Sequence, residues 1–338
     1  MQYDITVIGN DEAAFEMLCL AARAGQRTAA VLPESSHSSW LVSLALKRLV
    51  SDLLVDQCID RRQLLKRTGS PRLLRRLLAG AIVEETVEFT RMLDRLNVDV
   101  RLGQPRFINS HSIAIADGRT CEQSTLSSRH VIIGTGTRHT AMRRSPGPAG
   151  LHRPETMFEG NSLPQSLCML GGDDFGCGIA ALFSVFGVRS RHVARDNQDR
   201  AMLELAQAAG VDITFQPSGP GLIQAVEVLS DSHADVVDCR QSIGFTEHLN
   251  LSAIDVQADE NGQLWCSDGL ETWCPGVFGI GDVVGFSADS DVHPSVQAER
   301  IQQQISHQIP RPQLLDLFIN AEQSKTGLPG SARAFANN

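Results

Sequence analysis

Hydrophobic and polar positions divide the start of the chain into two strands with a helix between them. Residues 3–8 alternate in polarity and are rich in Ile and Val, which predicts a β-strand. Residues 12–24 carry apolar side chains at helical spacing, Gly25 closes that helix, and residues 28–32 form a second short strand. This order of elements is typical of half a mononucleotide-binding fold.

The next segment is predominantly helical before strands return. Apolar positions at helical spacing predict helices within residues 41–101, joined by a turn around residues 68–71. Residues 107–118 alternate in polarity and end in Asp-Gly, which predicts a hairpin. Residues 130–136 read HVIIGTG, an apolar strand that runs into glycines.

A second strand-turn-helix-strand pattern begins after a proline-rich stretch. Residues 141–164 contain four prolines and predict a linker. Beyond it follow an apolar strand, the turn LGGDDFG at 170–176, a helix at 177–186 and the strand RSRHVA. Because a strand-helix-strand crossover joins parallel strands, we expect an α/β fold with two Rossmann-like, doubly wound lobes. Residues 273–285 add a buried strand that ends in Gly-Ile-Gly-Asp, and we expect a loose tail after about residue 305.

Composition limits the class of protein. A chain of 338 residues suggests two domains, at a prior of about 150 residues for each. The apolar fraction of 42% and the charged fraction of 20% are those of an ordinary soluble globular protein. No apolar run approaches the roughly 20 residues that cross a bilayer, and the amino terminus lacks a basic segment before an apolar one. We therefore expect a cytoplasmic protein that does not contact the membrane.

Eight cysteines are scattered along the chain, with no Cys-x-x-Cys pair and no cluster of Cys and His at metal-ligand spacing. We expect reduced, mostly buried thiols and no metal site.

Charge distinguishes one segment from the rest of the chain. The net charge of −9 disfavours a general nucleic-acid binder. Residues 66–76, KRTGSPRLLRR, are basic and contain no acidic residue. They predict a solvated helix face, with a patch for phosphate, an acidic partner or nucleic acid as the open alternatives.

Two turns combine the features of a nucleotide-binding loop with an acidic residue. The turns at 9–14 and 171–176 each join a strand to a helix. Asp11 and Asp173 occupy the position of the second glycine, which in such turns lets the backbone approach a diphosphate. At 4 Å and an effective dielectric constant near 20, two like charges repel by roughly 4 kcal/mol, about a thousandfold in affinity. Because Asp is also a preferred helix cap, we expect each carboxylate to cap its own helix in place of a ligand's phosphate.

In their order along the chain, four motifs resemble those of the flavin-dependent pyridine nucleotide-disulfide oxidoreductases. They are the turn at 9–14, IIGTGTR at 132–138, PQSLCMLGGDDFGCGIAALFSVFGV at 164–188 and ETWCPGVFGIGDVVG at 271–285. Within that family the sequence is most similar to soluble pyridine nucleotide transhydrogenases and dihydrolipoamide dehydrogenases. The resemblance covers roughly residues 3–300. It implies an FAD domain formed by residues 1–150 and 263–338, with an NAD(P) domain inserted at 151–262.

The resemblance also implies which residues would contact each cofactor. The FAD contacts would be Gly9, Asp11 and Ala14 in the first turn, Thr135 and Gly136 near the flavin, and Gly281 and Asp282 at the ribityl chain. The NAD(P) contacts would be Gly171, Asp173 and Gly176 in the second turn. Arg195 and Arg200 stand where NADP-preferring relatives bind the 2′-phosphate, with a merely polar loop as the alternative.

Several positions depart from the family's pattern. The two redox cysteines are replaced by His37 and Val42, which excludes dithiol chemistry but leaves hydride transfer through a flavin possible. Leu32 and Ala194 replace the acids that bind the adenosine ribose, although Glu34 lies close to the first of them.

Two further departures concern a helix and the end of the chain. Gly178 replaces a helix glutamate near the junction of flavin and nicotinamide. The chain also stops before the family's C-terminal dimerisation domain, so we expect that domain to be absent.

Two hypotheses about function follow. The first is a non-catalytic or cofactor-poor descendant that keeps the fold as a binding or regulatory module. The alternative is an active NAD(P)H-dependent flavoprotein oxidoreductase that passes hydride through FAD, as a transhydrogenase does. The sequence assigns no catalytic residue, and FAD and NAD(P) are the ligands that the resemblance implies.

Overall fold

The computed structural model describes most of the chain in a series of segments. These are residues 2–33, 38–55, 70–118, 123–139, 151–152, 156–158, 161–194, 199–215, 235–239, 242–287 and 292–308. The tail expected after about residue 305 therefore lies almost entirely outside the described residues.

Seven strands form the larger sheet, in the order β3-β2-β1-β6-β5-β4, with β15 paired to the end of β6. They are β1 (Gln2–Ile8), β2 (Thr28–Leu32), β3 (Asp99–Leu102), β4 (Gln104–Asn109), β5 (Ser112–Ala116), β6 (Gln123–Ile133) and β15 (Val277–Gly279). Helix α1 (Glu12–Arg23) joins β1 to β2, which run parallel. The predicted strand-helix-strand unit at the start of the chain is confirmed.

Strands β4, β5 and β6 form an antiparallel meander at one end of this sheet. The predicted hairpin is confirmed, and its turn is formed by Ser110 and His111 between β4 and β5. Asp117 and Gly118 follow β5, at the start of the connection to β6. The Asp-Gly pair thus follows the hairpin and does not form its turn.

Five parallel strands form the smaller sheet, in the order β11-β10-β9-β12-β8. They are β8 (Leu151–His152), β9 (Ser166–Gly171), β10 (Arg189–Ala194), β11 (Asp212–Phe215) and β12 (Asp235–Cys239). Helix α5 (Asp173–Val185) joins β9 to β10, and α6 (Arg200–Ala209) joins β10 to β11. The predicted mixed α/β class is confirmed, and the second unit follows the predicted order of elements.

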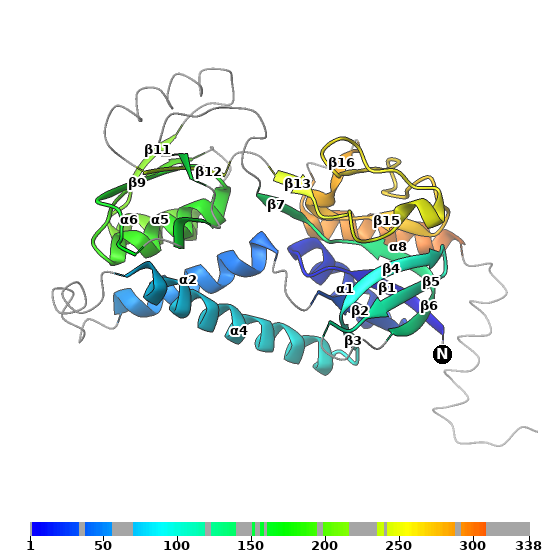
Figure 1. Cartoon of the computed structure of the whole chain (residues 1–338). Coiled ribbons are helices and arrows are strands. Elements are labelled where there is room, and N and C mark those ends of the chain that lie inside the picture. Colours follow the sequence, from blue (N-terminus) through cyan, green and yellow to red (C-terminus); the bar gives the residue numbers. More distant parts are fainter. Residues whose placement is uncertain are drawn as a thin grey trace, which may run out of the picture.

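Two helices from the first third of the chain pack beside the smaller sheet. They are α2 (Ser39–Val55) and the long α4 (Pro71–Arg95). Leu74 and Leu78 of α4 belong to the hydrophobic cluster around α5, whereas Phe89 and Leu93 belong to the cluster of the larger sheet. Figure 1 shows α4 passing below both groups of strands. One continuous helix therefore anchors both cores.

The remaining elements lie close to the larger sheet, except η1 (Thr156–Phe158), whose Phe158 ring contacts Phe183 of α5. The others are β7 (Thr137–His139), β13 (Ser242–Gly244), η2 (Leu251–Ile254), β14 (Leu264–Trp265), η3 (Gly281–Val283), β16 (Val284–Phe286) and α8 (Pro294–Gln308). β13 pairs antiparallel with β7, and α8 packs on α1. Leu249, Leu251 and Val256 are buried in the core of the larger sheet. Within the described segments, no helix is both long and apolar enough to cross a bilayer.

The thiols are consistent with the expectation of burial. Among the described residues, Cys19, Cys168, Cys177 and Cys239 are buried thiols outside any disulfide, and Cys266 and Cys274 are partly buried. Burial raises the pKa of Cys177 to about 12 and that of Cys168 to about 11. Cys58 and Cys121 lie outside the described residues. No group of three or more His, Cys, Asp or Glu side chains in the described segments is arranged to hold a metal ion.

Candidate functional site

The candidate site begins at the turn between β1 and α1, at the carboxyl end of a parallel strand. Open α/β sheets bind ligands at such strand ends. Gly9 has a φ angle of 126°, and a Cβ atom built on it would lie 1.9 Å from the Gly134 carbonyl oxygen. A Cβ atom on Gly134 would in turn lie 2.8 Å from Cβ of Ala14. Gly9, Gly134 and Ala14 therefore bring β1, α1 and the end of β6 into close contact.

Asp11 caps α1, as the sequence predicted. Its Oδ1 atom accepts a hydrogen bond from the Ala14 amide at 2.7 Å, and the residue is 7% exposed. A Cβ atom built on Gly281 would lie 2.5 Å from the other carboxyl oxygen, and one on Gly136 would lie 3.3 Å from it. The Asp11 carboxyl group thus fills the space between its own turn, Gly136 and Gly281.

The surroundings of Asp11 disfavour its charged form. Burial raises its pKa well above the ordinary value of a carboxyl group, and the nearby Asp282 and Glu12 raise it further, while the Ala14 amide lowers it. The pKa of Glu12 is also raised by burial, with Glu16, Asp282 and Asp174 contributing and His293 opposing them. Added negative charge is therefore unfavourable at the N-terminal end of α1.

The second turn differs from the prediction. The residue that precedes α5 is Gly172, with a φ angle of 79° and no side-chain cap, so Asp173 does not cap the helix. Asp173 is the first helical residue, has a φ angle of 42° and is exposed. Because the helix begins at residue 173, Asp173 follows the capping position instead of occupying it. The neighbouring Asp174 instead accepts a hydrogen bond from the Asp199 amide at 3.3 Å.

Glycines and a buried histidine hold the second turn together. A Cβ atom on Gly176 would lie 2.2 Å from the Gly171 carbonyl oxygen, so the helix can approach β9 this closely only with glycine. His192 of β10 is fully buried, and its Nε2 atom donates to the same Gly171 oxygen at 3.1 Å. Burial lowers the pKa of His192, and its Nδ1 atom has no hydrogen-bond partner within the described segments.

The remaining residues that the resemblance assigns to cofactor contacts lie in different environments. Thr135 has a buried hydroxyl oxygen with no partner in the part of the chain that the structure describes, and Asp282 is exposed within η3. Arg200 is exposed and pairs with Glu204 at 3.0 Å. Arg195, His37 and Glu34 lie outside the described residues.

The basic segment at 66–76 is described only from residue 70 onward. There Arg72, Arg75 and Arg76 are exposed on α4, while Leu74 is buried. The exposed arginines agree with the predicted solvated helix face, and the patch for phosphate, an acidic partner or nucleic acid stays an untested alternative.

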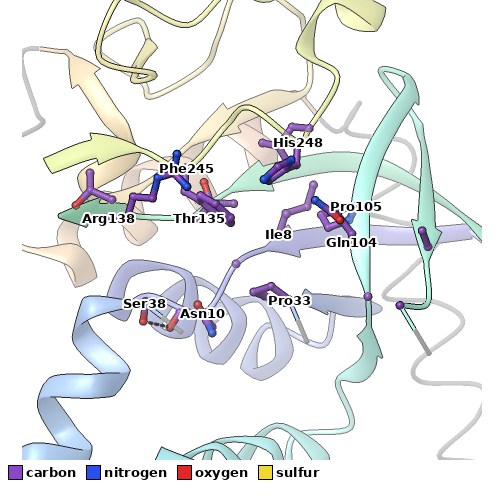
Figure 2. Close-up of a pocket in the computed structure, with 16 residues that line it drawn as sticks. Ile8, Asn10, Pro33, Ser38, Gln104, Pro105, Thr135, Arg138, Phe245 and His248 are labelled. Atoms are coloured by element: carbon purple, nitrogen blue, oxygen red, sulfur yellow. Dashed lines mark hydrogen bonds between the residues drawn. The ribbon is translucent and has the colours of Figure 1, made fainter. Parts of the chain in front are cut away.

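A cavity of about 530 Å³ lies in front of the first turn (Figure 2). Its lining comes from β1, the segment after β2, the meander, β7 and the loop before η2: Ile8, Gly9, Asn10, Pro33, Ser38, Gly103, Gln104, Pro105, Ala116, Gly118, Thr135, Thr137, Arg138, Phe245, His248 and Leu249. Sequence reasoning missed Gln104, Phe245 and His248, because their segments carry no motif. The one nearby feature of the sequence that could have indicated this site is Gly103, which precedes Gln104. Its φ angle of 144° is one that glycine adopts readily.

Aromatic and charged groups form one wall of the cavity. Arg138 pairs with Glu247, and its guanidinium lies 5.4 Å from the centre of the Phe245 ring. The rings of Phe245 and His248 meet edge to face, with centres 5.4 Å apart. Both rings are thereby held beside the space in front of β1.

A second contact joins α2 to α5. A Cβ atom on Gly178 would lie 2.9 Å from Cβ of Leu46, and Val42 of α2 packs against the same hydrophobic cluster. The helices are therefore in direct contact at the position where the resemblance places a glutamate.

Two strand-turn-helix units with glycines at close backbone approaches define a protein of the dinucleotide-binding α/β class. The chain belongs to the pyridine nucleotide-disulphide oxidoreductase family. The sequence profile of that family matches residues 3–307.

Individual relatives are similar over most of the chain. A soluble pyridine nucleotide transhydrogenase of Mycobacterium bovis is 24% identical over 320 residues, which cover 85% of this chain and 67% of the relative. The transhydrogenase of Pseudomonas putida is 24% identical over 317 residues, with 84% and 67% covered.

Solved structures support the same fold. The HOCl-induced flavoprotein disulfide reductase RclA of Escherichia coli is 19% identical, has a TM-score of 0.56 and covers 91% of this chain and 72% of its own. LpdA of Mycobacterium tuberculosis is 19% identical, has a TM-score of 0.57 and covers 89% and 72%.

Proposed function

We propose that this chain is a cofactor-poor, non-catalytic member of its family that keeps an FAD-type and an NAD(P)-type domain as a binding or regulatory module. The observation that carries the proposal is the position of the Asp11 carboxyl group. It accepts from the Ala14 amide and lies against Gly136 and Gly281, which the resemblance assigns to FAD. The residues present therefore do not fit the diphosphate of FAD, which would need the same space at the start of α1.

The larger and smaller sheets would correspond to the two domains. Leu249, Leu251 and Val256 pack in the core of the larger sheet. This packing favours ending the inserted domain before Ser242 instead of at residue 262.

The contact between α2 and α5 supports the same proposal. Redox chemistry in such a protein would need room between the two domains for a flavin and a nicotinamide to meet. Here Leu46 and Gly178 touch, and Val42 occupies a cysteine position. We infer that this junction serves packing.

The proposal is tested by the visible spectrum of the purified protein and by titration with FAD. We expect a colourless protein that takes up no added FAD at micromolar concentrations. A flavin band close to stoichiometric with the protein would overturn the proposal and favour the alternative, an active NAD(P)H-dependent flavoprotein oxidoreductase.

Two variants separate charge from bulk. Asp11→Asn keeps the volume and the cap but removes the charge, whereas Asp11→Gly removes both. Gain of FAD binding in both variants would identify repulsion as the cause, with an upper limit of about a thousandfold. Gain only in Asp11→Gly would identify bulk, and gain in neither would show that Asp11 is not the obstacle. Asp173→Gly is the matched control and should leave FAD binding unchanged, because Asp173 lies in the other turn.

A further inference from the structure

The long helix α4 presents one side to the solvent, and Figure 1 shows it along the lower edge of the described part of the molecule. We propose that this side binds a second copy of the chain, through an antiparallel pair of α4 helices centred on Val83. The inference is independent of the proposed function, because it involves neither of the two glycine turns.

Spacing along α4 brings a defined set of residues to this side. With 3.6 residues per turn, positions that are four, seven or eleven residues apart share one side of a helix. The residues that share it with Val83, and that form with it the outer face of α4, are Arg72, Arg76, Ala79, Val87, Thr90 and Asp94. All of them are exposed except Thr90, which is partly exposed.

The middle of the outer face is apolar. Val83 is 61% exposed and Val87 is 43% exposed, on successive turns of the helix. Single exposed valines are common on protein surfaces, but these two continue into the small residue Ala79. In an antiparallel pair with Val83 on the two-fold axis, Val87 of each copy lies opposite Ala79 of the other, a large side chain against a small one.

The charges of the outer face are symmetric about the same position. Arg72 lies eleven residues before Val83 and Asp94 lies eleven residues after it. The antiparallel pair therefore places Arg72 of each copy opposite Asp94 of the other, with opposite charges at both ends of the contact. A parallel pair would instead bring Arg72 to Arg72 and Asp94 to Asp94. Charge complementarity thus favours a second copy in the antiparallel direction.

These two charges are available for such a contact. Within the described segments, α4 forms ion pairs through Glu84, Glu85 and Glu88, and none through Arg72 or Asp94. Association would therefore give Arg72 and Asp94 a partner without breaking an existing pair. The acidic partner that the basic segment at 66–76 left open would be α4 of a second copy.

Sedimentation equilibrium of the full chain, from about 1 to about 200 μM, tests the inference. We expect a monomer–dimer equilibrium with a micromolar dissociation constant, because one helix face is a small interface. Val83→Glu should raise this constant at least tenfold, since two carboxylates would meet at the two-fold axis. Val55→Glu is the matched control and should leave it unchanged, because Val55 is an exposed valine on α2, outside the outer face of α4.

Charge reversal tests the register and keeps the experiment decisive if Val83→Glu fails to fold. Arg72→Asp and Asp94→Arg should each raise the dissociation constant roughly 3- to 30-fold, because each replaces two symmetry-related attractive pairs with repulsive ones. The variant with both changes should return to within about threefold of wild type, since it restores opposite charges at both ends.

Three results would overturn the inference. One is a chain that stays monomeric over the whole concentration range, and another is a dimer that Val83→Glu leaves as tight as wild type. The third is a double variant that dimerises no better than Arg72→Asp or Asp94→Arg alone, which would exclude the antiparallel register.

Discussion

Leu46 of α2 and Gly178 of α5 are in direct contact, so close that a Cβ atom on Gly178 would lie 2.9 Å from Cβ of Leu46. Both atoms belong to rigid parts of helices, so neither can rotate away as the end of a flexible side chain could. The contact also lies where α2, from the first third of the chain, packs on α5 and α6, the helices that join the strands of the smaller sheet. Glycine at this position therefore sets how closely the two helices pack.

Gly178→Ala is expected to destabilise the protein by about 1–3 kcal/mol, the usual cost of overpacking a core. The matched control is Gly80→Ala on α4, where a Cβ atom would meet no other atom within 4 Å. That change should stabilise the protein by up to about 1 kcal/mol, because alanine is the better helix former. Urea unfolding measures both variants, and changes of the same sign would contradict the assigned packing.

The stability of the Asp11→Asn variant relative to wild type is expected to increase as the pH rises. Burial raises the pKa of Asp11, so the folded protein holds this proton more tightly than the unfolded chain does. Wild type therefore loses stability relative to the variant from about pH 3.9, the unfolded value, up to the folded pKa, by at most about 1.4 kcal/mol per pH unit. Unfolding free energies of both proteins between pH 4 and 8 give the difference.

Asp11→Ala provides the control for that experiment, since it removes the charge together with the helix cap. It should cost about 0.5–2 kcal/mol relative to Asp11→Asn at every pH. A difference between wild type and Asp11→Asn that stays constant with pH would show that Asp11 titrates normally.

His192→Gln is expected to reduce the loss of stability in mild acid. Burial lowers the pKa of His192, so the unfolded chain binds the proton more readily than the folded protein does. Wild type therefore loses stability as the pH falls from about 6.5 through the folded pKa, and the variant lacks this contribution. Melting temperatures of both proteins from pH 7.5 to 5 test this, and parallel curves would contradict it.

Asp173→Gly is expected to stabilise the second turn by up to about 1 kcal/mol. Asp173 has a φ angle of 42°, in the left-handed region that glycine adopts without steric cost. Asp173→Ala retains the Cβ atom and should bring no gain, which separates backbone strain from charge. Equal stabilisation by both variants, measured by urea unfolding, would point to the carboxylate instead.

Local patterns were sufficient for much of the fold. The alternation in residues 3–8 and the helical spacing in residues 12–24 predicted β1 and α1, because burial of one face leaves a periodic trace in the sequence. The cap by Asp11 was also predictable, because it is a local contact with the Ala14 amide three residues away. Asp173 stands at the corresponding position of the second turn. There the helix begins at Asp173 itself, whereas α1 begins one residue after Asp11, and no local pattern indicated this difference.

The sequence by itself determined the order of strands and helices, the two glycine turns and the family, because each depends on contacts within an element or on motifs read along the chain. Only the tertiary structure decided that the Asp11 carboxyl group lies against Gly281, that Leu46 meets Gly178, and that Gln104 and His248 share a cavity with Thr135. These residues are far apart in the chain. Their contacts depend on how the sheets and helices pack, which hydrophobic periodicity does not specify.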